Sequence, residues 1–201
     1  GVYYLDDKID IKTWDFGNGA QDIVNQKTRS IALFGQLEYS VNDTFAVTGG
    51  LRYTGDDKEL RVIPGINSPS PADSISASDS FASWDLAFTY DATDEWSFYG
   101  RIANASRGPV TLGRFGFVSS AETETTNSIE VGFKSVLLEG RARWNTSLYS
   151  FTNDDQQLTA TGGVGNANRL LNADKVPGTE VLVPTSWTGD HGLTLVEYAP
   201  F

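Results

Sequence analysis

Cysteine is absent from the 201-residue chain, which excludes a disulfide framework, a thiolate nucleophile and a cysteine metal site. Histidine occurs once, at His191, too little for a histidine metal cluster or a catalytic triad without other ligands. Positive charge is also scarce, and a net charge of −11 provides no basic stripe for nucleic acid. The sequence therefore predicts no catalytic residues, no cofactor and no bound metal, and we expect a protein that is not an enzyme.

Long apolar runs are missing as well. No segment approaches the roughly 18 consecutive apolar residues of a transmembrane helix. This does not exclude a membrane protein, because the strands of a transmembrane barrel alternate apolar and polar residues and have the average hydropathy of a soluble chain. Aromatic residues, in contrast, are abundant at 12%, and there are 20 glycines.

The sequence contains a repeated pair of alternating segments. Between residues 31 and 54, apolar and polar residues alternate on both sides of a polar turn at Asn42 and Asp43. Period-two alternation of this length predicts strands with one apolar and one polar face. The same unit recurs with turns near Thr93-Asp94 and Glu139-Gly140, and more weakly near Gly189-Asp190.

Three long polar segments separate these units: residues 55–80, 104–127 and about 152–173. The first contains Ser68-Pro69-Ser70-Pro71, which is typical of an irregular loop. Short turns at one end and long loops at the other are typical of outer-membrane barrels, whereas turns come every 8–12 residues in a sandwich. We therefore predict an all-β fold: an antiparallel transmembrane β-barrel segment of up-and-down hairpins, with short periplasmic turns and long extracellular loops.

Aromatic residues flank two of the short turns on the apolar face. Tyr39 and Phe45 flank the first turn, and Tyr90 and Trp96 flank the second. Aromatic rings collect where hydrocarbon meets water, so this placement predicts an interfacial girdle. The alternative is that these rings only stabilise each hairpin across its strands.

Several segments resemble the barrel of TonB-dependent outer-membrane receptors. They are Gly1 to Asp7, Ser30 to Tyr53 with Gly50-Leu51-Arg52-Tyr53-Thr54 at its end, Trp96 to Pro109, Glu124 to Gln157 with Ser128-Ile129-Glu130-Val131-Gly132-Phe133-Lys134-Ser135, and Asn172-Ala173-Asp174-Lys175 leading to Gly178-Thr179-Glu180-Val181. The resemblance covers nearly the whole chain in the expected order. Pro177 and residues 197–201 fit the family pattern poorly.

The resemblance implies that residues 1–201 form one partial receptor barrel. Family members have a 22-stranded barrel and an N-terminal plug, whereas this chain predicts about nine strands and no plug domain. The final residues, Glu197 to Phe201, are interpreted as a truncation because Pro200 removes a ladder donor. Because nine strands leave two open edges, we expect that this segment alone neither folds stably nor transports anything.

As a function, the resemblance implies TonB-dependent active uptake of a scarce nutrient, such as a ferric siderophore, across the bacterial outer membrane. The expected partners are outer-membrane lipid, the TonB energy-coupling complex acting through the missing plug, and a small-molecule or metal-chelate ligand, with no nucleic acid. Two alternatives remain open: a passive pore or small structural barrel complete as given, and a soluble β-rich binding module.

The polar faces of the predicted strands supply the candidate functional residues. In a complete receptor they would project inward, where they contact the plug and line the substrate path, although any one of them could serve only to pair across strands. The loop with Arg107, Arg114 and Phe115 is the best candidate for ligand contact, since arginine suits an anionic ligand, while Glu122 and Glu124 weaken that positive field. The full candidate set is Arg52, Asp85, Tyr99, Arg101, Arg107, Arg114, Glu130, Lys134, Arg143 and Asn145.

Two acidic pairs are the remaining candidates. Asp56-Asp57 and Asp154-Asp155 could hold a hard cation such as calcium, but are better explained as solvated residues at loop ends. His191 is expected in a solvated turn.

Overall fold

The computed structural model describes residues 1–14, 21–66, 72–114, 117–162, 167–183, 185–188 and 194–197. Every regular element in these residues is a β-strand, and every strand pair is antiparallel, which confirms the predicted fold class. None of the residues described forms a helix long and apolar enough to cross a membrane. The strands are β1 (Val2–Trp14), β2 (Gln21–Ser40), β3 (Phe45–Pro64), β4 (Asp73–Thr93), β5 (Trp96–Arg107), β6 (Val110–Arg114), β7 (Phe117–Ala121), β8 (Glu124–Leu137), β9 (Ala142–Gly162), β10 (Ala167–Leu182), β11 (Thr185–Thr188) and β12 (Thr194–Glu197).

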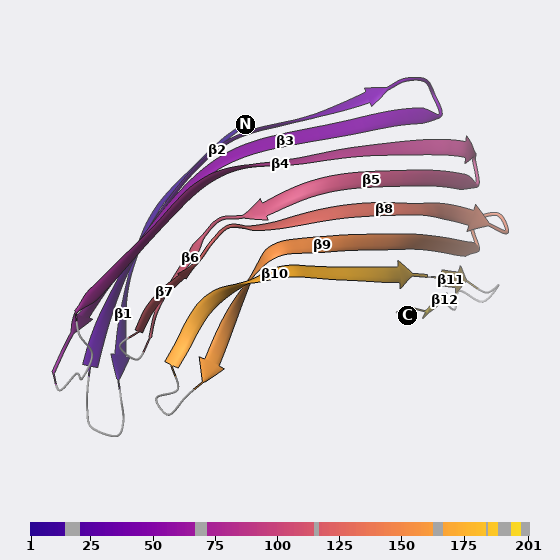
Figure 1. Cartoon of the computed structure of the whole chain (residues 1–201). Coiled ribbons are helices and arrows are strands. Elements are labelled where there is room, and N and C mark those ends of the chain that lie inside the picture. Colours follow the sequence, from indigo (N-terminus) through magenta and orange to yellow (C-terminus); the bar gives the residue numbers. More distant parts are fainter. Residues whose placement is uncertain are drawn as a thin grey trace.

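One sheet contains ten of these strands, and β6 and β7 form a separate hairpin. The sheet order is β1-β2-β3-β4-β5-β8-β9, after which β10 and β11 both pair with β9, and β12 pairs with β11. Figure 1 shows a long, bent sheet whose short turns lie together at one end, on the right of the view. From β1 to β5, strands that are consecutive in the sequence pair with each other. This is the up-and-down arrangement expected of a barrel wall.

The register places the predicted apolar positions on one face. Leu51 lies opposite Trp84, and Leu86 lies opposite Ile102. Ile102 in turn lies opposite Ile129 on β8. Because facing residues in neighbouring strands share a face, one apolar surface extends across the sheet. We call this surface the outer face and the opposite surface the inner face.

The outer face exposes its apolar side chains instead of burying them. Leu33, Leu37 and Leu51 are 66%, 72% and 62% exposed, and none of them packs against a second sheet. From Phe45 to Tyr53 the apolar positions of β3 span eight residue steps, about 26 Å along the strand and about 20 Å across a bilayer at a tilt of about 40°. An exposed apolar band of this height matches the hydrocarbon layer of a thin outer membrane.

Aromatic rings gather on the outer face beside the short turns. Phe45 contacts Tyr90, with ring centroids 6.5 Å apart. Further along the sheet, the rings of Trp96, Phe133 and Trp144 form one cluster, with centroids 5.2 to 6.5 Å apart. The predicted aromatic positions therefore lie at one level of the sheet, and the cluster on β5, β8 and β9 extends this level.

The three expected long loops are wrong over most of their length. Residues 55–64 continue β3 and residues 73–80 begin β4, while the segment 152–173 contains the end of β9 and the start of β10. Residues 104–107 and 124–127 extend β5 and β8, and the hairpin β6–β7 lies between them. We call the end of the sheet with the short turns its lower end. The strands keep their hydrogen-bonded pairing in these upper segments, although the apolar alternation that predicted the lower parts of the strands has ended.

The alternation does not simply fade; it inverts. Above Ile31 and Tyr53, the outer face carries charged residues such as Lys27 and Glu59, which face each other in the register. The inner face at this height carries apolar residues: Val24, Leu60 and Val62 are at most 4% exposed. Since the register of β2 with β3 contains no shift, the exchange of faces is a property of the sequence and not of a bulge.

The β6–β7 hairpin explains the apolar inner face. Val24, Leu60 and Val62 form a small core, against which Val118 of β7 packs. Gly113 of β6 approaches so closely that a Cβ there would lie 2.7 Å from a methyl group of Leu60. The hairpin therefore lies on the inner face of β2–β4, and Figure 1 shows it between β4 and β10 in the bent half of the sheet.

The outer face predicts a test of the membrane band. Replacing Leu86 by Arg should lower the free energy of unfolding of the full-length protein in lipid vesicles by about 2–4 kcal/mol, because the charge enters the middle of the band. Denaturant unfolding measures the loss. Thr48→Arg, on the inner face of the neighbouring strand, is the matched control and should cost less than 1 kcal/mol. Equal losses at both positions would contradict the assignment of faces.

The small inner core predicts local destabilisation. Leu60→Ala should weaken the docking of the hairpin by about 2–4 kcal/mol, as truncation of a buried leucine usually does. Amide hydrogen exchange should then rise in residues 110–121 while the ladder near Leu33 stays protected. Ile63→Ala, on the outer face of the same strand, should leave the hairpin unchanged. Unaltered exchange in Leu60→Ala would show that the hairpin is held by other contacts.

Candidate functional site

The inner face between the turns and the hairpin carries most of the predicted site residues. Asp85 of β4 and Arg101 of β5 lie on this face, and the guanidinium Nε is 3.5 Å from the carboxylate Oδ2. The Arg101 side chain is 52% exposed and the Asp85 side chain 26% exposed. An ion pair this open to solvent contributes at most about 1 kcal/mol to stability. The main effect of the pair is therefore to make the inner face polar, and its contribution to the stability of the sheet is small.

A second group lies beside it on β5 and β8. The hydroxyl of Tyr99 donates a hydrogen bond of 2.9 Å to Oε1 of Glu130. The ammonium of Lys134 lies 5.5 Å from the centre of the Tyr99 ring, within cation–π range. Glu130 also faces Arg101 across the strands, so this part of the inner face has alternating charge.

Gly132 makes the position of Tyr99 possible. The two residues face each other in the register of β5 and β8. A Cβ at Gly132 would lie 2.7 Å from the Tyr99 ring and 2.6 Å from the carbonyl oxygen of Thr146. The end of the Tyr99 ring therefore occupies the space that a side chain at position 132 would need, and from there its hydroxyl reaches Glu130.

Arg52 belongs to a third group that sequence reasoning described only in part. Its guanidinium lies 5.4 Å from the centre of the Tyr3 ring and 5.6 Å from that of Phe34. Its Nε donates to Oγ1 of Thr54 at 2.9 Å. Tyr3 and Phe34 were missed as site residues, and the signal was present: both are aromatic residues at positions where the alternation calls for polar ones.

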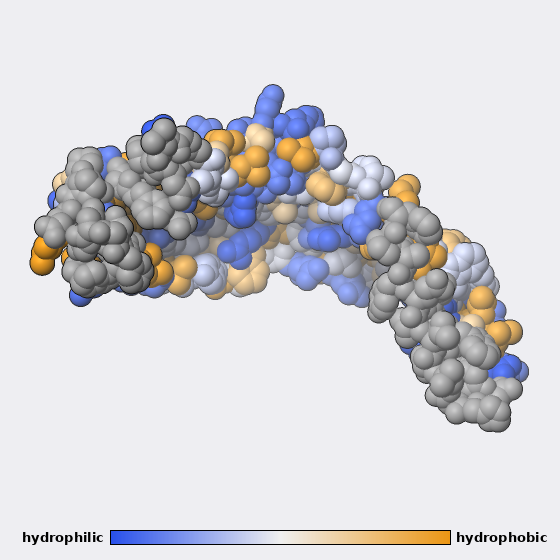
Figure 2. Space-filling view, turned by 90° about the horizontal axis from the view of Figure 1, so that it is seen from below, coloured by the Kyte–Doolittle hydropathy of each residue, from blue (hydrophilic) through white to orange (hydrophobic). Residues whose placement is uncertain are grey.

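Lys134 and Asn145 face each other in the register, nearer the short turns. Arg143 lies one inner-face step closer to the turn, opposite Val136. The structure thus brings Tyr99 together with Glu130 and Lys134. Arg52, Asp85 and Arg101 border one cavity on the inner face, while Arg143 lies nearer the short turns. Figure 2 shows an arched molecule in which hydrophilic residues gather near the middle of the arch.

Arg107 lies at the upper end of β5 and not in a loop. Its Nη2 donates to Oε2 of Glu124 at 2.8 Å, and the same oxygen accepts the backbone N–H of Gln157. The Gln157 amide donates to the carbonyl oxygens of Gly108 and Glu122 at the base of the hairpin. Arg107 is therefore paired with an acid at the hairpin base, and its side chain stays 62% exposed.

The rest of the predicted ligand loop is only partly described. Arg114 ends β6 at the tip of the hairpin, but its side chain and Phe115 lie outside the described residues. Hydrogen bonds join the hairpin, and Glu122 directly after it, to β10. Ser119 accepts the N–H of Leu170 at 2.9 Å, and Asn172 accepts the N–H of Glu122 at 2.8 Å. Arg114 therefore belongs to a docked element that lies over the inner face.

The acidic pairs do not lie at loop ends, as the sequence suggested. Asp56 lies within β3, where its carboxylate accepts a hydrogen bond from the hydroxyl of Ser30 at 2.5 Å. Asp154 lies within β9, 3.8 Å from the ammonium of Lys175. In the described part of the chain, no three or more His, Cys, Asp or Glu side chains are grouped as metal ligands would be. His191 lies outside the described residues.

The family of the chain follows from the comparison of its sequence with family models. Residues 1–194 match the model described as TonB dependent receptor-like, beta-barrel. The chain belongs to this family. Its members are barrels of the bacterial outer membrane, and they are transport receptors and not enzymes. No curated protein matches the sequence.

Solved structures of such receptors share the fold of this barrel segment. The ferric yersiniabactin uptake receptor FyuA from Yersinia pestis matches with a TM-score of 0.74 and 17% identity, over 96% of this chain and 30% of that one. The copper transporter OprC gives a TM-score of 0.64 at 14% identity, over 92% and 35% of the chains. The alcaligin receptor FauA from Bordetella pertussis gives 0.58 at 16% identity, over 100% and 34%. The chain thus spans about a third of the length of these structures.

The packing at Gly132 predicts a specific loss in the receptor barrel. Gly132→Ala should displace Tyr99, break its bond to Glu130 and lower the free energy of unfolding by about 1–3 kcal/mol, the usual cost of overpacking. Urea unfolding of the full-length receptor in vesicles measures this change. Gly35→Ala is the matched control, because a Cβ at Gly35 meets nothing within 4 Å. A cost at Gly35 as large as at Gly132 would refute the proposed role of Tyr99.

Proposed function

We propose that this chain is the barrel part of a receptor for TonB-dependent active uptake of a scarce nutrient, such as a ferric siderophore, across the outer membrane. The match of residues 1–194 to the receptor barrel family carries the proposal. In this mechanism, outer loops capture the ligand, and a plug rearranges when the TonB complex transmits energy from the inner membrane. The plug belongs to the remainder of the protein.

The open sheet supports a larger barrel. In the described residues β1 pairs only with β2, and the opposite side of the sheet ends at β10 and β12. A sheet edge cannot face hydrocarbon unpaired, because its N–H and C=O groups would have no partners. Further strands are therefore required to close the wall. This favours the partial barrel over the alternative of a small, complete pore.

The inner face supports passage of a polar cargo. Its charges occur in both signs and largely neutralise one another, as in the Asp85–Arg101 pair. Such a surface is wettable and offers hydrogen bonds without a deep, single-sign site that would retain the ligand. The candidate residues Arg52, Tyr99, Lys134, Arg143 and Asn145 would then contact the plug or border its path.

The nature of the cargo is supported by relatives alone. One similar structure is a receptor for ferric yersiniabactin and another is a copper transporter. Because these proteins share one fold and carry different metals, the wall of the barrel does not determine the ligand. A ferric chelate is proposed because three of the similar structures are described as ferric or iron receptors or transporters.

Uptake by living cells tests the proposal. Cells with the full-length receptor should accumulate radiolabelled iron from at least one ferric siderophore, and deletion of the receptor or of TonB should abolish this uptake. A proton uncoupler should have the same effect. Labelled glucose entry, which needs no such receptor, is the control. Uptake that persists without TonB would favour the passive pore, and iron uptake unchanged by loss of the receptor would refute a ferric ligand.

A further inference from the structure

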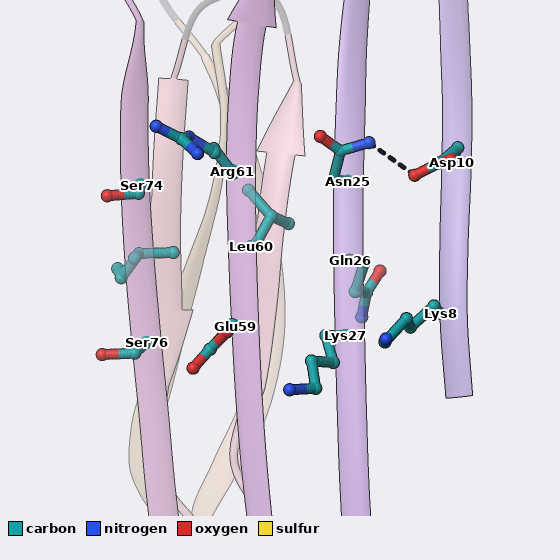
Figure 3. A pocket seen from close by; sticks show the side chains of 11 residues that line it. Lys8, Asp10, Asn25, Gln26, Lys27, Glu59, Leu60, Arg61, Ser74 and Ser76 are labelled. Atoms are coloured by element: carbon teal, nitrogen blue, oxygen red, sulfur yellow. Dashed lines mark hydrogen bonds between the residues drawn. The ribbon is translucent and has the colours of Figure 1, made fainter. Parts of the chain in front are cut away.

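A groove lies on the outer face of β1–β4, above the apolar band. Its volume is about 550 Å³, and charged outer-face residues of β1, β2 and β3 border it: Lys8, Asp10, Lys27, Glu59 and Arg61. Ser74 and Ser76 of β4 complete the border. Figure 3 shows these side chains on four adjacent strands, with the ribbon of the hairpin passing on the far side of the sheet. The groove is thus separate from the inner-face site.

The cations of the groove lack protein partners. Lys8 and Lys27 lie directly opposite each other in the register of β1 and β2. Like charges in facing positions destabilise a sheet unless an anion lies between them. Among the described residues, no carboxylate lies within 4.0 Å of the charged nitrogens of Lys8, Lys27 or Arg61. Arg29, one outer-face step from Lys27 on β2, is paired instead, 3.5 Å from Asp6.

The acids of the groove do not satisfy these cations. Asp10 accepts a hydrogen bond from the side-chain amide of Asn25, its neighbour across the strands. Glu59 faces Lys27 in the register but does not approach it within 4.0 Å. Three serine or amide side chains, Asn25, Ser74 and Ser76, add hydrogen-bond donors to the same border. The result is a set of donors arranged for an external anion.

The height of the groove determines which anion meets it. On the side of the short turns, the apolar outer-face positions of β1 are Val2 and Tyr4, and Lys8 follows four residues after Tyr4. This is about 13 Å along the strand and about 10 Å above the hydrocarbon at a tilt of about 40°. The outer face at this level adjoins lipid headgroups, and the turns lie at the opposite end of the strands.

We propose that this groove binds the phosphate groups of the outer-leaflet glycolipid, with Lys8, Lys27 and Arg61 as the anion-binding residues. Lysine and arginine bind phosphate by charge-assisted hydrogen bonds, and a phosphate between Lys8 and Lys27 removes their mutual repulsion. The glycolipid acyl chains would lie against the exposed apolar residues below, such as Leu33. The site depends on the position of this wall in the outer membrane and not on the identity of the transported ligand.

The test uses the full-length receptor in detergent and a fluorescent, bis-phosphorylated lipid A as the probe. The triple variant Lys8→Gln, Lys27→Gln, Arg61→Gln should bind lipid A at least roughly tenfold more weakly than the natural protein, as expected for the loss of charged hydrogen bonds. Lys175→Gln is the matched control, because Lys175 lies on the outer face of β10 but is already paired with Asp154. It should leave the affinity within twofold.

A second variant guards against a folding defect in the triple variant. Glu59→Gln keeps all the cations and removes an acid from the groove, so it should bind lipid A more tightly. Unchanged affinity in the triple variant, or equal binding of lipid A without its phosphates, would overturn the proposal. So would inorganic phosphate binding as tightly as lipid A, because the site would then serve a soluble anion. Uptake of the transported ligand should be unaffected in all variants, which separates this proposal from the proposed function.

Discussion

Hydrocarbon cannot hydrogen-bond to a peptide group, and this constraint shapes the whole chain. Each N–H and C=O within the membrane must be satisfied inside the protein, and a protein that crosses with strands can do this only as a closed wall. The continuous ladder from β1 to β9 meets this requirement over nineteen facing pairs between β2 and β3 alone. Side chains are then free to differ on the two faces. Leu51 can face lipid while Arg52, the next residue, faces the interior.

The exchange of faces along β2 and β3 follows from the change of surroundings. Within the membrane, the outer face meets hydrocarbon and the inner face meets water, so Leu33 points out and Thr54 points in. Above the membrane, the outer face meets water and headgroups, while the inner face packs against the hairpin. Leu60 and Val62 accordingly turn inward, and Glu59 and Arg61 turn outward. One uninterrupted register serves both environments because its side chains alternate with a period of two.

The inner-face charges and the hairpin have complementary roles. Pairs such as Asp85–Arg101 and Tyr99–Glu130 keep the interior polar without a strong net field. The hairpin narrows the same space from above, held by the apolar core at β2–β4 and by polar contacts to β10. β5 and β8 end at Arg107 and Glu124, whereas β4 and β9 on either side of them run further from the short turns. The hairpin, attached to β2–β4 on one side and to β10 on the other, spans the wall at that point. Arg107 lies at the base of this hairpin, paired with Glu124.

Alternation alone determined the fold class, the turns and the outer face, because burial of one face leaves a period-two record in each strand. Positions such as Leu86 and Ile102 could be assigned from that record before their contact was known. The upper parts of the strands could not be predicted. Beyond Gly55 the apolar residues move to the inner face and charged residues occupy the outer face, so the segment resembles a polar loop. Which inner residues meet was also hidden: Arg101 faces Glu130 but is paired with Asp85, and the packing of Tyr99 over Gly132 depends on a register between strands. The number of residues between Tyr99 and Gly132 does not determine which residues of β5 and β8 face each other. Only the tertiary structure decides that register.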